Sequence, residues 1–115
     1  MKPRSGKNKG RKLQNFVRDM LRDTFPGLHK DDIKSQTMGM TGEDIVLSPA
    51  ARNVIPYSFE CKNVERLDLW GSLAQAETNS EDRDPVLVIK RNRSKVYAII
   101  ELDTFLDVIG VENEQ

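Results

Sequence analysis

The sequence predicts an α/β domain in which a small mixed β-sheet is flanked by helices. Two segments, residues 11–25 and 67–79, carry apolar residues at helical spacing. Two others, residues 85–90 and 96–102, are nearly continuous apolar runs of the kind that form buried strands. Helical and strand patterns alternate along the chain, which favours a sheet covered by helices. The 115 residues suit one domain with its own core.

The start of the chain is expected to form a basic tail and then a helix. Residues 1–9 are rich in Lys and contain Gly and Pro, which predicts disorder. A helix should follow from about Arg11 to Phe25, because Pro26-Gly27 stops it. Gln14 is expected at the edge of the apolar face. That face holds Leu13, Phe16, Val17, Met20 and Leu21.

The middle of the chain is expected to form three short strands. The first is centred on Ile33, and the glycine-containing residues 37–42 predict a flexible loop after it. Residues 45–47 and 54–62 are the second and third strands, and residues 48–53 are the expected turn of a hairpin between them.

The last part of the chain is expected to form a helix over residues 67–79, a two-stranded hairpin and a final helix. The hairpin loop is basic and separates the two long apolar runs. Asp103 should cap the final helix, which Gly110 ends. The domain is therefore expected to span residues 10–110, with residues 111–115 as an acidic tail.

The charges of the chain are balanced in number but not in position. There are 18 Lys and Arg and 18 Asp and Glu, so the net charge is zero. Cations gather in the first dozen residues and in the late hairpin loop, whereas residues 101–115 contain acids and no Lys or Arg. Such asymmetry can give a neutral protein a positive face that binds an anionic partner. A solvated tail and a soluble loop are the alternative.

The cysteine content and the hydropathy pattern indicate the compartment. The single cysteine, Cys61, cannot form an intrachain disulfide, which fits a reducing environment. No apolar run approaches the ~20 residues that a membrane-spanning helix needs. No apolar signal segment follows the basic N-terminus. We therefore expect a cytoplasmic protein without a membrane partner.

The stretch YSFECKN, residues 57–63, places two opposite charges on a strand that otherwise looks buried. Residues two apart on a strand point to the same face. Glu60 and Lys62 therefore lie together, while Phe59 and Cys61 share the other face and can be buried. A surface ion pair on an open sheet face is the simplest explanation of this pattern.

A metal site is the alternative explanation. If this strand pairs with the one before it, Asp44 lies near Glu60, and two carboxylates ~4 Å apart repel by about 4 kcal/mol at an effective dielectric constant of 20. A divalent cation between them would offset that repulsion. The Cys61 carbonyl is a candidate third ligand, and Lys62 could orient or deprotonate a metal-bound water.

At these residues the chain resembles the PD-(D/E)xK nucleases. The strings "GEDIVL" and "FECK" look like the core motifs of that superfamily. The order of elements is similar to that of its small Holliday junction resolvases from archaea and phages, over about Lys9 to Ile109. The resemblance implies a restriction-endonuclease-like core that binds Mg²⁺, with Mn²⁺ able to substitute. It also implies that Asp44 and Glu60 are the metal ligands and that Lys62 is the catalytic lysine.

Several positions depart from this pattern. Glu43 stands where the family often has proline, and on strand parity it points away from Asp44. Resolvases commonly have a glutamate in the first helix, where this chain has Gln14, whose neutral amide could contact a metal-bound water or phosphate. Ser35 could match a loop serine of the resolvases, and Gln75 a helix glutamine that faces the site. An ordinary loop serine and an exposed helix glutamine are the alternatives.

The resemblance implies a Mg²⁺-dependent endonuclease of phage or prophage type that cuts branched DNA. A four-way junction needs two symmetric cuts, so a homodimer is expected. The helix that bears Leu69, Trp70 and Leu73 is one possible interface, with Trp70 either there or in the core. Another nuclease of this fold, acting on duplex or single-stranded DNA, and a DNA-binding module with weak catalysis are the alternatives. Contacts to phosphates are expected from Lys7, Lys9, Arg11, Lys12, Arg91, Arg93 and Lys95.

Overall fold

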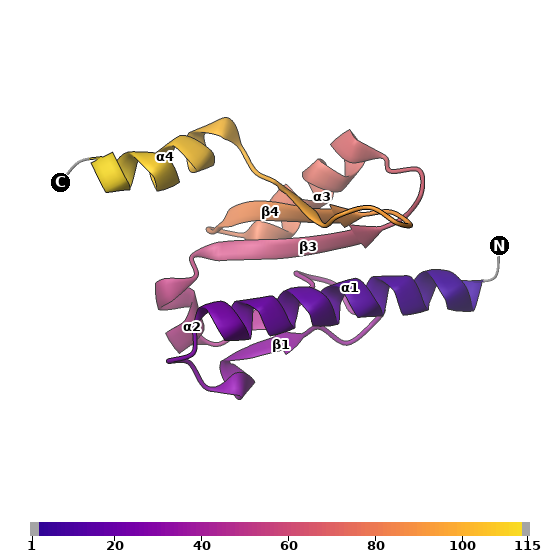
Figure 1. Ribbon diagram of the computed structural model, residues 1–115, viewed down its shortest axis with the longest axis horizontal. Coiled ribbons are helices and arrows are strands. Elements are labelled where there is room, and N and C mark those ends of the chain that lie inside the picture. Colours follow the sequence, from indigo (N-terminus) through magenta and orange to yellow (C-terminus); the bar gives the residue numbers. More distant parts are fainter. Residues whose placement is uncertain (1–2, 114–115) are drawn as a thin grey trace.

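The computed structural model describes the backbone of residues 3–113 and the side chains of residues 6–110 (Figure 1). The elements follow one another in the order α1 (Pro3–Thr24), η1 (Lys30–Asp32), β1 (Ile33–Ser35), β2 (Ile45–Leu47), α2 (Pro49–Val54), β3 (Tyr57–Asn63), α3 (Leu69–Ser80), β4 (Asp84–Lys90), β5 (Tyr97–Ile99) and α4 (Leu102–Asn113).

The strands form two small sheets that meet at one hydrogen bond. Strands β1 and β2 are antiparallel, whereas β3 pairs in parallel with β4, and β4 pairs in antiparallel with β5. At the junction, the backbone N–H of Asp44 donates to the carbonyl of Phe59 at 2.9 Å. The expected α/β class, with mixed strands flanked by helices, is confirmed.

Helices α1 and α3 cover opposite faces of the larger sheet (Figure 1). Odd-numbered residues of β3, such as Phe59 and Cys61, face α1 and join a core that includes Leu13 and Val17. Even-numbered residues face α3, because the Asn79 side chain on that helix bonds to Glu60. Strand β3 is therefore covered on both sides, and its polar residues Ser58 and Glu60 are buried between layers.

The parallel pair β3–β4 requires a crossover, which α3 supplies. Asp68 is the N-cap of this helix, and its carboxylate accepts a hydrogen bond from the Gly71 N–H at 3.1 Å. Trp70, in the first turn, is 78% exposed, so the expectation that it could belong to the core is wrong. The crossover lays α3 antiparallel to β3, which places one side of the helix above Glu60.

Helix α1 is longer than predicted, and its buried face is narrower. Residues 3–9, expected to be a disordered tail, form the first turns of the helix, while residues 1–2 lie outside the described part. Lys9 contacts the end of β3 and the loop after it. Its carbonyl accepts a hydrogen bond from the Asn63 side chain, and its ammonium lies 3.4 Å from the Glu65 carboxylate. Phe16 and Met20, expected on the buried face, are 45% and 53% exposed.

The connection from β2 to β3 is a helix and not the expected hairpin turn. Ser48 is the N-cap of α2, its hydroxyl accepts from the Ala51 N–H at 3.1 Å, and Pro49 occupies the first turn. Because this helix intervenes, β2 and β3 diverge, and the expected third strand begins at Tyr57 instead of residue 54.

Helix α4 differs from the prediction at both ends. It begins at Leu102, one residue before the expected cap Asp103, and it continues through Gly110 to Asn113. A glycine inside a helix costs only about 1 kcal/mol relative to alanine, which is not enough to end it. The expected acidic tail over residues 111–115 is therefore helical to Asn113, and residues 114–115 lie outside the described part. Among residues 3–113, no helix is long and apolar enough to cross a bilayer.

Candidate active site

Asp44 is fixed where the two sheets meet. Gly42 has φ of +102°, a backbone conformation that favours glycine, and it turns the chain into Glu43 and Asp44. The backbone of Asp44 is bonded on both sides, to Phe59 and to the Gln36 N–H. Its side-chain Oδ2 accepts from the backbone N–H of Cys61 at 2.6 Å. The carboxylate is thus brought to β3, although the hairpin expected to do this does not exist.

Glu60 and Lys62 lie on the α3 side of β3, as strand parity predicts. Glu60 is 5% exposed, and its Oε1 accepts from the Asn79 side chain at 3.3 Å. The ammonium of Lys62 lies 3.9 Å from Oε2 of Glu60. Glu60 is buried, so the pair is not the open-surface ion pair that the sequence left as an alternative.

Burial raises the pKa values of both carboxyls, and like charge adds to this effect at Glu60. Burial raises the pKa of Asp44, against the opposing effects of the Cys61 N–H, the Lys62 charge and a hydrogen bond from Gln14. Burial also raises the pKa of Glu60, and the charge of Asp44 raises it further. The two anions are close enough to destabilise each other, and one partly exposed lysine does not neutralise both.

Gln14 reaches this pair from α1. Gln14 is 7% exposed, so it belongs to the buried face of the helix. The expectation that it lies at the edge of that face is wrong. The amide contacts Asp44, whereas the buried Oε1 has no hydrogen-bond partner among the described residues. Leaving such an acceptor unsatisfied costs ~1–3 kcal/mol. A buried oxygen without a partner in this position is well suited to bind a water or a cation.

Cys61 contributes its backbone and not its thiol. Its N–H points toward Asp44. The N–H and C=O of one strand residue point to the same edge of the strand, so its carbonyl points toward the same side. Burial raises the pKa of the thiol, and the charges of Asp44 and Glu60 raise it further. The side chain therefore stays a neutral thiol.

The donor set fits a hard cation that keeps several waters. No group of three or more His, Cys, Asp or Glu residues with metal-binding geometry occurs in the part of the chain that the structure describes. Mg²⁺ does not need such a group, since it is commonly held by one or two carboxylates with waters and substrate phosphates. Asp44 and Glu60 supply the charge, and the Gln14 amide oxygen and the Cys61 carbonyl are neutral oxygens beside them.

Two other candidate residues lie apart from the carboxylates. Gln75 is exposed, and the α3 residue that contacts Glu60 is Asn79, one turn later. Residues four apart share a helix face, so Gln75 lies on the same side as Asn79 but farther along. Ser35 ends β1 instead of lying in a loop, and its hydroxyl donates to the Asn15 side chain at 2.8 Å.

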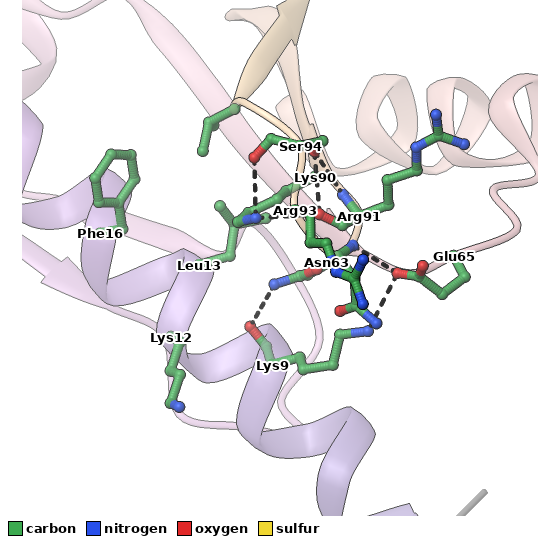
Figure 2. Close-up of a pocket in the computed structure, with 12 residues that line it drawn as sticks. Lys9, Lys12, Leu13, Phe16, Asn63, Glu65, Lys90, Arg91, Arg93 and Ser94 are labelled. Atoms are coloured by element: carbon green, nitrogen blue, oxygen red, sulfur yellow. Dashed lines mark hydrogen bonds and ion pairs between the residues drawn. The ribbon is translucent and has the colours of Figure 1, made fainter.

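A basic groove runs between α1 and the loop that joins β4 to β5 (Figure 2). Its volume is about 1060 Å³, and it combines the two basic clusters of the sequence, which are some 80 residues apart. Four expected phosphate contacts line it, namely Lys9, Lys12, Arg91 and Arg93. Three others do not, namely Lys7, Arg11 and Lys95, which are exposed elsewhere.

Sequence reasoning missed three polar residues at these sites. Asn79 bonds to Glu60, and Asn63 lines the groove with an Oδ1 that has no partner among the described residues. Glu65 accepts from the Asn92 N–H at 2.7 Å and from Lys9. Asn79 is one turn after the candidate Gln75, which was the available signal. Nothing in the sequence alone marks the other two.

Comparisons with protein-family models, with curated proteins and with solved structures found no significant match to this chain.

Proposed function

We propose that this protein is a Mg²⁺-dependent endonuclease with a restriction-endonuclease-like core that hydrolyses phosphodiester bonds in DNA. The observation that carries the proposal is the convergence of Asp44, Glu60 and Lys62, with the unpartnered oxygen of Gln14 beside them. A buried and a partly buried carboxylate with raised pKa values, placed close together, are unfavourable for folding, and perturbed carboxyls of this kind cluster at functional sites.

The groups divide the work of hydrolysis by position. A bound divalent cation would polarise the phosphate and lower the pKa of a bound water. Asp44 and Glu60 would hold that cation, with the Gln14 oxygen and the Cys61 carbonyl as neutral contacts. Asn79 fixes one oxygen of Glu60 and leaves Oε2 toward Lys62. Lys62 would orient the attacking water as an ammonium, or would accept the proton of that water after first releasing its own proton to solvent.

The basic groove supplies a surface for phosphates but not the chemistry. None of Asp44, Glu60 and Lys62 lines it. Asn63, directly after Lys62 on β3, does line it on the α1 side. Lys62 lies on the opposite face of β3, where it lines a second hollow that shares Glu65, Lys90, Arg91 and Ser94 with the groove, and these shared residues support a common substrate for the two regions.

Branched DNA is the substrate we propose, with a homodimer as the acting form. Two copies related by a two-fold axis place two sites symmetrically on a junction. Exposed apolar residues support self-association, with Trp70 on α3 and Leu102, Phe105 and Leu106 on α4. The second candidate is a nuclease with the same chemistry that acts on single-stranded or duplex DNA. The apolar lining of the groove by Leu13 and Phe16 favours it.

Cleavage of labelled DNA tests the proposal. A four-way junction, a linear duplex and a single strand are incubated with Mg²⁺, with or without a chelator. We expect cutting of the junction that the chelator stops and that Glu60→Gln abolishes. Cutting only of the duplex or the single strand would assign the second candidate. Binding without cutting under all conditions would make the protein a DNA-binding module, and neither binding nor cutting would refute the proposal.

A further inference from the structure

We propose that the groove between α1 and the β4–β5 loop holds an unpaired DNA strand, with a base stacked on Phe16 and phosphates on Lys12, Arg91 and Arg93. This subsite rests on the proposed function for the identity of its ligand. It goes further because it gives the groove a preference for single-stranded segments over continuous duplex.

Phe16 is the first observation. It lies on α1, is 45% exposed and lines the groove together with the apolar side chains of Leu13 and Val96. Figure 2 shows Phe16 at one end of the groove and Glu65 at the other, with the basic loop between them. An aromatic ring among cations is the arrangement that binds single strands, since each base stacks on the ring while the cations follow the backbone. In a continuous duplex the base faces are already stacked on each other.

The charge of the groove is the second observation. Its cations outnumber its single acid, Glu65, whose carboxylate is already engaged by Lys9 and by the backbone N–H of Asn92. That backbone hydrogen bond holds the pKa of Glu65 below its usual range.

Hydrogen bonds within the loop hold the backbone from which its arginines extend. The ammonium of Lys90 donates to the carbonyls of Arg91 and Ser94, both at 3.1 Å, and the Ser94 hydroxyl accepts from the Arg91 N–H at 3.0 Å. Arg93 has φ of +62°, in the left-handed region that glycine or asparagine adopts more readily. Because glycine fits this backbone conformation at least as well, Arg93→Gly removes the side chain without disturbing the backbone of the loop.

The groove also carries an acceptor suited to a base edge. Asn63 lies in the groove and donates its amide N–H to the Lys9 carbonyl at 3.2 Å, which fixes the orientation of the side chain. Its Oδ1 is the atom that has no partner within the described residues. Exocyclic amines of unpaired bases are donors that could satisfy it. The volume of about 1060 Å³ exceeds that of most sites for drug-sized molecules, ~300–1,000 Å³, and admits a short strand.

Binding of gapped DNA to the full chain tests this subsite, in the presence of a chelator so that no cutting occurs. The fluorescent base 2-aminopurine is placed in a short single-stranded gap, and a continuous duplex of the same length is the comparison. We expect the wild-type protein to quench the fluorescence by stacking and to prefer the gapped DNA. Phe16→Leu should remove the quenching and weaken gapped binding on the order of tenfold, with duplex binding unchanged.

Matched variants separate these effects from folding. Met20→Leu, one turn along the same helix and outside the groove, should leave the quenching intact. Arg93→Gly relieves the positive φ, so the melting temperature should hold or rise. The log–log slope of binding against salt should still fall by about 0.7, the value for one phosphate of a single strand. Glu81→Gly, at the other non-glycine position with positive φ among the described residues and at the end of α3, should leave that slope unchanged.

The outcomes distinguish this subsite from the nuclease proposal. Loss of quenching in Phe16→Leu supports the subsite even if wild-type protein never cuts DNA with Mg²⁺. Equal loss of gapped and duplex binding, or no loss in either, overturns the subsite even if cutting is observed. If Phe16→Leu changes the sedimentation of the DNA-free protein but leaves gapped binding unchanged, the subsite is also overturned. A second copy of the chain would then occupy the groove.

Discussion

Glu43 and Asp44 are neighbours in the chain, yet the fold treats their charges in opposite ways. Glu43 accepts from Arg83 at 2.5 Å, and its other oxygen lies 3.5 Å from Arg52. Asp44 is turned the other way and meets Glu60, a second carboxylate, whose pKa its charge raises. The first acid is buried and neutralised. The second is partly buried and repelled.

The difference shows that this fold can provide an arginine for a buried acid where stability requires one. Arg83 is itself 9% exposed and serves Glu43. No arginine is placed between Asp44 and Glu60 within residues 6–110, where the nearest cation is the ammonium of Lys62. The repulsion between Asp44 and Glu60, left without an arginine beside a pair that has one, supports the proposal that a cation binds there.

Removing the cation on the repelled side should have the largest effect. Lys62→Ala is expected to lower the rate of DNA cleavage by about 10²–10⁴-fold, the usual contribution of a positioned proton acceptor. Binding of the junction should stay within a few-fold, because Lys62 does not line the basic groove. Single-turnover cleavage and anisotropy measure the two quantities. Cutting at near the wild-type rate would remove Lys62 from the active site.

Removing the cation on the neutralised side should affect stability and not chemistry. Arg83→Met leaves Glu43 buried without its main partner, and breaking a buried pair in this way costs roughly 3–5 kcal/mol. Urea unfolding should show this loss. Cleavage per folded molecule should remain near the wild-type value. A stable Arg83→Met protein would mean that Arg52 suffices to neutralise Glu43.

The same substitution at the two acids should change stability in opposite directions. Glu60→Gln removes the repulsion with Asp44 and should raise the free energy of unfolding of the metal-free protein on the order of 1 kcal/mol. Glu43→Gln should lower it. Mg²⁺ at tenfold its dissociation constant should stabilise the wild type by ~1.4 kcal/mol and Glu60→Gln much less. Equal losses in both variants would show that the Asp44–Glu60 repulsion is negligible.

The pH dependence of the metal-free protein follows from the raised pKa of Glu60. An acid whose pKa is higher in the folded state than in the unfolded state stabilises the protein below its unfolded pKa, and this stability is lost as pH rises through the folded pKa. The wild type should therefore lose unfolding free energy across that window, from weakly acidic pH upward. Glu60→Gln should flatten the profile, as urea unfolding at a series of pH values would show.

The smallest effect is expected at Gln14. Gln14→Glu adds a charge beside Asp44 and should lower the Mg²⁺ concentration that half-saturates cleavage by a few-fold, because the cation gains an anionic neighbour. In the metal-free protein the same change should reduce stability, since it adds a third buried carboxylate. Gln14→Leu serves as the control that keeps the volume and removes the oxygen. Unchanged Mg²⁺ dependence in both variants would place Gln14 outside the site.

Local sequence patterns determined most of the elements and one face of the site. Strand parity alone put Glu60 beside Lys62, because alternation in a strand does not depend on what the strand packs against. The apolar run before Lys90 correctly indicated a buried strand, whereas the run over residues 96–102 gives only a short and mostly exposed strand, β5, so its prediction as a buried strand is wrong. The signal for α2 was also present, since Ser48-Pro49 is a favoured N-cap and first helical position, but it was read as a turn.

Only the tertiary structure decided which residues of each predicted element are buried and which distant segments lie together. The apolar stripe of α1 is wider than the small sheet that covers it, so Leu13 and Val17 are buried while Phe16 and Met20 are left exposed. Asp44 is joined to β3 by its backbone bond to Phe59 and its side-chain bond to Cys61 at a sheet junction, where the sequence had suggested a hairpin. The basic groove joins residues near 10 to residues near 92, and no short-range pattern encodes such a pairing. Packing of distant segments set these features because each depends on the area and direction of a partner surface, which the local sequence does not contain.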